Sequence, residues 1–105
     1  MAGVGKLMKQ AAKMQKQMEA LQNDLAAQFI EVSSGGGAIT VKISLGQEME
    51  SIKIDPEFLK EEVSIIEETL LEGIKLAYTQ SKEKSEGAMN QLAEAMRLPG
   101  MPSLF

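Results

Sequence analysis

The chain has neither cysteine nor histidine among its 105 residues. Without thiols there can be no disulfide framework, zinc knuckle or thiolate nucleophile. Without imidazole the most common catalytic base and nitrogen ligand for metals are missing. Two pairs of acids, Glu61-Glu62 and Glu67-Glu68, fall on a helical face predicted to be exposed, where solvated carboxylates are typical. We therefore expect a protein that is not an enzyme and that uses no metal, cofactor or small-molecule substrate.

Large rings and long apolar runs are scarce as well. The chain has no Trp, one Tyr and three Phe, whereas its eight Met supply adaptable packing or a soft interaction surface. So few rings for a self-sufficient core predict an oligomer. No apolar stretch approaches the roughly 20 residues that span a bilayer, and the N-terminus lacks the pattern of a signal peptide. We expect a cytoplasmic protein without a membrane partner.

The N-terminal part of the chain predicts a helix from about Val4 to Gln28. Its apolar residues are spaced by alternating steps of four and three, which is the pattern of a coiled-coil heptad. They form a heptad seam that consists of Leu7, Ala11, Met14, Met18, Leu21 and Leu25. A helix with such a seam is expected to pack against a partner helix.

Four lysines repeat along an adjacent face of the same helix. This lysine row consists of Lys6, Lys9, Lys13 and Lys16, and no acid precedes Glu19. Cations near a helix N-terminus oppose the helix dipole, at a cost of a few tenths of a kcal/mol each. The row predicts contact with a run of phosphates, and the lack of interleaved aromatic residues favours backbone contacts to duplex DNA over base stacking. The same spacing is also typical of the solvated flank of a coiled-coil seam.

The net charge of −4 is unevenly distributed along the sequence. Residues 1–18 carry +4, residues 48–72 carry −7, and residues 75–105 carry +1. The acid is therefore concentrated in the middle, while both ends are neutral to basic. Near the C-terminal end, Lys82, Lys84 and Arg97 are further candidates for phosphate contacts.

The remaining patterns predict an α+β fold in a single domain, residues 1–105. Period-two alternation before and after the Gly35–Gly37 break, and again up to Ile54, indicates a three-stranded antiparallel meander. Ile52 and Ile54 are expected to point inward. Asp55-Pro56 is typical of a helix start, so a short helix follows and then a long C-terminal helix from about Ser64 to Met96. The predicted parts are a helical arm 1–28, a sheet 29–55, a helical region 56–97 and an irregular tail 98–105.

Four segments together resemble one known family over nearly the whole chain. They are Leu7-Met8-Lys9-Gln10-Ala11-Ala12-Lys13-Met14-Gln15, the Gly-rich turn before Ile39-Thr40-Val41-Lys42-Ile43, the Ile54-Asp55-Pro56 junction, and Leu98-Pro99-Gly100-Met101-Pro102. The chain is similar to the YbaB/EbfC family of small bacterial nucleoid-associated proteins. The resemblance implies a tweezer-like homodimer whose long terminal helices project from a body of sheets and short helices. It also implies duplex DNA binding in the nucleoid, with roles in nucleoid organisation and gene regulation.

Within this resemblance, Lys9 and Lys13 fall in the matching first-helix segment, and Lys6 and Lys16 extend the same face. Lys82, Lys84 and Arg97 lie in the other arm. A different class of function remains open, namely a protein–protein adaptor that clasps a partner through its heptad and Met-rich helices, for example in DNA repair or replication, without touching DNA.

Overall fold

The computed structural model describes residues 2–95, and the predicted tail 98–105 lies outside this range. The elements in chain order are α1 (Ala2–Ala26), β1 (Phe29–Ser34), β2 (Ile39–Ser44), β3 (Met49–Ile54), the short 3₁₀ helix η1 (Pro56–Lys60) and α2 (Val63–Ala95). The strands form one antiparallel sheet in the order β1-β2-β3. The predicted α+β class and helix–meander–helix order are confirmed.

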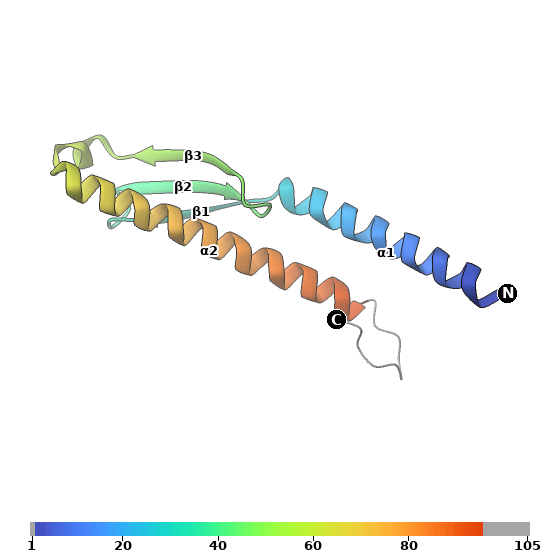
Figure 1. The fold of residues 1–105 in the computed structure, drawn as a ribbon. Coiled ribbons are helices and arrows are strands. Elements are labelled where there is room, and N and C mark those ends of the chain that lie inside the picture. The colour runs from blue at the N-terminus through green and yellow to red at the C-terminus, as the bar shows by residue number, and fades with distance from the viewer. Residues whose placement is uncertain (1, 96–105) are drawn as a thin grey trace.

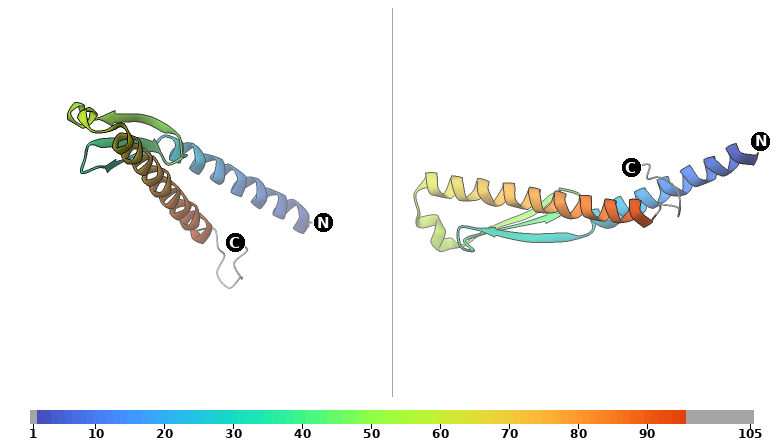
Figure 2. Two further views of the ribbon diagram at one scale, coloured as in Figure 1. Left: turned by 60° about the vertical axis from the view of Figure 1, so that its left-hand side comes forward. Right: turned by 90° about the horizontal axis from the view of Figure 1, so that it is seen from below.

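Helix α2 packs on one face of the sheet, and its contacts are concentrated on β1 and β2. Figure 1 shows α2 in front of the sheet, and the view from below in Figure 2 shows the two as separate layers. The alternating residues of β2 point toward the helix, so Ile39, Val41 and Ile43 are fully buried and pack with Val32 and Ala77. The core therefore lies between α2 and the first two strands.

The turn between β1 and β2 depends on its three glycines. Gly35, Gly36 and Gly37 have φ values of 62°, 68° and 95°, a region that residues with a side chain rarely adopt. A Cβ on Gly35 would also lie 2.6 Å from Cγ2 of Thr69, so the turn sits directly against α2. The Gly-rich run is thus a hairpin turn, as predicted, and it does not precede a helix as a phosphate-binding loop would.

The predicted helix start after β3 is confirmed in its details. Oδ1 of Asp55 accepts a hydrogen bond from the backbone N–H of Glu57 at 3.1 Å, and Pro56 occupies the first helical position. The chain then turns at Glu61, and α2 begins at Val63, one residue earlier than expected.

The prediction that Ile52 points inward is correct for the face of the sheet on which it lies, but Ile52 is not part of the core. Ile52 pairs with Val41 and so shares the helix-facing row of the sheet, but its side chain is 41% exposed. The reason is the position of α2, which covers β1 and β2 and leaves β3 beyond its edge. Ile54, at the end of the same strand, is half-buried.

A buried hydroxyl joins α2 to the turn between β2 and β3. Oγ of the fully buried Ser81 donates to the carbonyl oxygen of Ser44 at 2.6 Å and accepts from Nε2 of Gln47 at 3.1 Å.

Because Ser81→Ala removes both bonds, we expect the free energy of unfolding to fall by about 1 kcal/mol in a urea titration. Thr79→Ala, on the exposed side of the same helix, is the control, and equal stability of the two variants would contradict the role of Ser81.

Candidate nucleic-acid interface

The heptad seam of α1 becomes steadily more exposed toward the N-terminus. Leu25 is 5% exposed, Leu21, Met18 and Met14 are half-buried, and Leu7 is 66% exposed. Helix α1 is therefore held by its last turns alone within the single chain, and its N-terminal half carries an uncovered apolar seam.

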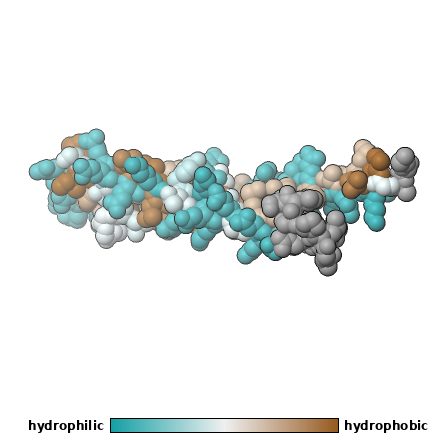
Figure 3. Space-filling view, turned by 60° about the horizontal axis from the view of Figure 1, so that its bottom comes forward, coloured by the Kyte–Doolittle hydropathy of each residue, from teal (hydrophilic) through white to brown (hydrophobic). Residues whose placement is uncertain are grey.

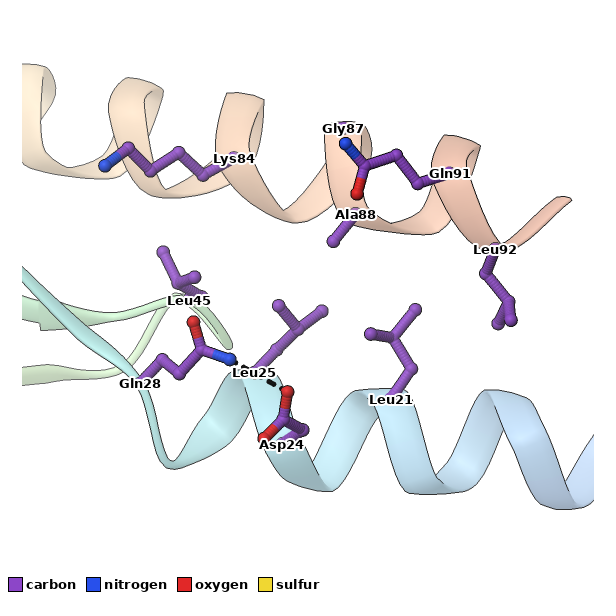
Figure 4. Close-up of a pocket in the computed structure, with 10 residues that line it drawn as sticks. All are labelled: Leu21, Asp24, Leu25, Gln28, Leu45, Lys84, Gly87, Ala88, Gln91 and Leu92. Atoms are coloured by element: carbon purple, nitrogen blue, oxygen red, sulfur yellow. Dashed lines mark hydrogen bonds between the residues drawn. The ribbon is translucent and has the colours of Figure 1, made fainter. Parts of the chain in front are cut away.

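The root of α1 lies against the turn between β2 and β3. The backbone N–H of Leu45 donates to the carbonyl oxygen of Gln28 at 2.9 Å, and a Cβ on Gly46 would lie 3.5 Å from Cα of Ala26. Above this turn a groove separates α1 from the C-terminal half of α2, and Figure 4 shows Leu21 and Leu25 of α1 facing Ala88 and Leu92 of α2 across it. The turn contacts set the direction in which α1 leaves the sheet.

Beyond this root α1 projects away from the rest of the molecule. The chain measures 72 × 22 × 16 Å, and its radius of gyration is 20.1 Å, against about 13 Å for a compact domain of this length. Figures 1 and 2 show that α1 extends past the end of α2, with its N-terminus at the tip. The projecting part of α1 contains the lysine row.

All four side chains of the lysine row are exposed. With about 100° per residue, the centre of the row lies about 140° around the helix from the centre of the heptad seam. The row is therefore nearly opposite the seam and not on the adjacent face expected from the sequence. The row spans about 15 Å, an axial length that holds four to five phosphates of one DNA strand. A partner helix on the seam would leave the row accessible.

No carboxylate of residues 2–95 neutralises the row. The ion pairs in this part of the chain join Lys42 to Glu50 at 3.5 Å and Lys60 to Glu57 at 3.0 Å, and neither includes a residue of α1. The four ammonium groups thus form a continuous positive face on a projecting rod, which favours contact with a polyanion.

The candidates in the C-terminal arm are arranged differently. Lys82 and Lys84 are both exposed on α2. Because they are two residues apart in a helix, their side chains point about 160° away from each other around the helix axis. Lys84 lines the groove beside the root of α1, as Figure 4 shows, and Lys82 projects from another side. Arg97 lies outside the described residues. Lys82 and Lys84 therefore do not form one face with the lysine row.

Apolar residues at the tip of α1 form a feature that the heptad pattern only partly predicted. Val4, Leu7 and Met8 are 57%, 66% and 69% exposed, so the uncovered surface is wider there than the seam itself. In Figure 3 hydrophobic atoms gather near the N-terminal end of α1 and again over the sheet end of the molecule. The signal in the sequence was Val4, which continues the four-and-three spacing of the seam three residues before Leu7, together with Met8 beside it.

Other kinds of site find no support within residues 2–95. These residues contain no group of three or more acidic side chains close enough to hold a metal ion. None of the helices there has an apolar stretch that would cross a bilayer.

Comparison with known proteins agrees with the resemblance. Residues 1–96 match the sequence profile of the YbaB/EbfC DNA-binding family. A nucleoid-associated protein of Dictyoglomus thermophilum is 36% identical over 99 residues, which cover 93% of each chain. A nucleoid-associated protein of Gluconobacter oxydans is 44% identical over 97 residues, which cover 92% of this chain and 85% of the relative.

A crystal structure of an uncharacterized protein from Helicobacter pylori has the same fold. It superimposes with a TM-score of 0.72 at 22% identity, and the alignment covers 88% of this chain and 96% of the other. From the match over nearly the full length and the identities to curated relatives, the chain belongs to the YbaB/EbfC DNA-binding family.

Proposed function

We propose that this protein binds duplex DNA without enzymatic activity, as a nucleoid-associated protein of the cytoplasm, through phosphate contacts of the lysine row. The observation that carries the proposal is the row itself, which is exposed, free of ion pairs within residues 2–95 and located on a projecting helix. The family and the names of the relatives support the same partner. The proposed role in the cell is nucleoid organisation and gene regulation.

The acidic net charge is compatible with this function because charges of opposite sign are separated along the molecule. The nine acids of residues 48–72 lie on β3, η1, the first turns of α2 and the short segments next to these elements, whereas the lysine row lies on α1 beyond the sheet. With a Debye length of about 8 Å at physiological salt, those carboxylates do not cancel the field around the tip of α1. Binding then depends on local phosphate neutralisation, not on net charge.

We also propose Lys82, Lys84 and Arg97 as secondary phosphate contacts. Because Lys82 and Lys84 project from nearly opposite sides of α2, a single duplex contacts no more than one of them on the same helix. Their contribution to affinity is expected to be smaller than that of the lysine row.

The active unit in this proposal is a homodimer with both α1 arms free, like the ends of tweezers. The buried hydrophobic side chains number only seven in residues 2–95, a small core for an independent domain. This small core favours burial of further apolar surface against a second copy.

Titration of duplex DNA at two salt concentrations tests the proposed function. We expect the logarithm of the association constant to fall linearly with the logarithm of salt concentration, with a slope near −3.6 if the four lysines of one row each neutralise a phosphate. Two unrelated duplex sequences should bind with similar affinity, because phosphate contacts carry no sequence information. Affinity that does not change with salt would refute the proposal.

One observation favours a second candidate, a protein–protein adaptor. The uncovered seam and tip of α1 expose large apolar side chains that a partner helix could cover. A pull-down with and without nuclease separates the two functions, because an adaptor keeps its partners after nucleic acid is digested and a DNA-bound protein loses those held through DNA.

A further inference from the structure

We propose that the groove between α1 and the C-terminal half of α2 is a binding site for an apolar peptide, and that its occupant is segment 96–105 of the same chain. The bound segment connects the two helices and gives α1 a second attachment besides the turn between β2 and β3. This site does not depend on DNA binding or on the proposed homodimer.

The groove is lined by apolar side chains from both helices. Leu25 and Leu45, at the root of α1, are 5% and 7% exposed, whereas Leu21, Ala88 and Leu92 farther along the groove are only partly buried. Figure 4 shows Leu21 facing Leu92 across the open space, which has a volume of about 570 Å³. Ligand cavities in proteins have volumes of about 300–1,000 Å³, so the groove has room for a short peptide.

The place where α2 ends in the described residues identifies the occupant. Ala95 lies three residues after Leu92, so segment 96–105 begins beside the mouth of the groove. A short covalent connection to a site gives a segment an effective concentration in the millimolar range. This advantage favours the chain's own segment over a separate peptide of similar composition.

The composition of the segment fits an apolar groove. Five of its ten residues are apolar, and Arg97 is its only charged residue. Pro99-Gly100 is typical of the two central positions of a type II turn, because Pro fixes φ at the first and Gly tolerates positive φ at the second. Such a turn reverses the chain and directs residues 101–105 back toward the groove.

The length of the segment is sufficient to reach the groove. The outgoing residues 96–98 cover at most about 10 Å, and the returning residues 101–105 cover about 16 Å when extended. The difference of about 6 Å exceeds the roughly 4.5 Å that separates Ala95 from Leu92 along the axis of α2. Leu104 and Phe105 therefore reach the level of Leu92 and can cover the apolar side chains there.

The first test uses the absence of cysteine, which makes introduced thiols unique. Gln91→Cys at the rim of the groove and Ser103→Cys in the segment leave all apolar side chains in place. We expect a short bis-maleimide to link these thiols within one chain in at least tenfold higher yield than in the control pair Asn90→Cys and Ser103→Cys. Asn90 is also exposed, but it lies about 130° around α2 from the centre of the groove-lining residues.

Two results of the cross-linking would overturn the proposal. Equal yields for the two pairs would show that the segment has no preference for the groove. A product with twice the 11.4 kDa chain mass in place of the intrachain link would put the segment in the groove of a second copy.

The second test places a carboxylate on the segment and measures amide hydrogen exchange. Leu104→Asp makes occupation of the apolar groove unfavourable, so the turns of α2 that the segment covers should open more often. We expect residues 88–92 to exchange at least threefold faster in Leu104→Asp than in the wild type. Ser103→Asp adds the same charge at a polar position and should leave these rates unchanged. Equal rates in all three proteins would contradict binding of the segment.

Discussion

Replacing all four lysines of the lysine row with glutamine is expected to lower the affinity for duplex DNA by about 10³-fold at 0.1 M salt. Each phosphate contact contributes about 0.9 to the slope of log K against log salt, so the loss of four contacts reduces the slope by about 3.6. At 0.1 M salt a change of this size in the slope corresponds to the loss of about 10³-fold in affinity. Gln and Lys have similar helix propensities, so α1 should remain helical. Fluorescence anisotropy of a labelled duplex at several salt concentrations measures both quantities.

A variant with the same change in net charge controls for nonspecific electrostatics. Lys42, Lys53, Lys60 and Lys75 are the lysines of the sequence that belong to neither candidate group, and their joint replacement by Gln also removes four charges. This control should lose less than tenfold in affinity. If the two quadruple variants weaken binding equally, the effect reflects total charge and the lysine row is not the interface.

Gly73→Ala is expected to lower the free energy of unfolding by about 2 kcal/mol, although alanine is the better helix former. A Cβ at this position would lie 2.7 Å from Oγ of Ser34 and 3.5 Å from Cγ2 of Val41, so α2 must move away from the sheet or Ser34 must give up its bond to Thr69. Overpacking of this kind costs about 1–3 kcal/mol, which outweighs the helix-propensity gain of about 1 kcal/mol. Urea denaturation at a fixed protein concentration measures the change.

Two further variants test this explanation of Gly73. Ser34→Ala removes the oxygen that a Cβ would meet, so the double variant should be more stable than the sum of the single effects predicts. Gly87→Ala lies in the same helix with no atom within 4 Å of the added Cβ and should raise stability by about 0.5–1 kcal/mol. Additive effects in the cycle would show that Gly73 is not constrained by Ser34.

Elements and turns could be predicted because they depend on neighbours in the chain. The alternation through Ile39, Val41 and Ile43 specifies a strand with one buried face, and Asp55-Pro56 specifies a helix start through one side chain and one fixed φ. The spacing of the lysine row likewise places its members on one face of α1 before any tertiary contact forms. These features follow from backbone geometry and periodicity, which the local sequence contains.

The coverage of each face was decided only by tertiary packing. Periodicity placed Ile52 on the inward row, but the lateral position of α2 over β1 and β2 left it exposed. The heptad pattern does not show that Leu25 is buried and Leu7 exposed, because that gradient depends on how far α1 projects beyond the rest of the fold. Lys82 and Lys84 lie close in sequence yet project from opposite sides of their helix. The sequence by itself determined the helices, the strands and the positive face of α1; the long-range packing of α2 determined which surfaces stay open, since burial depends on residues distant in the chain.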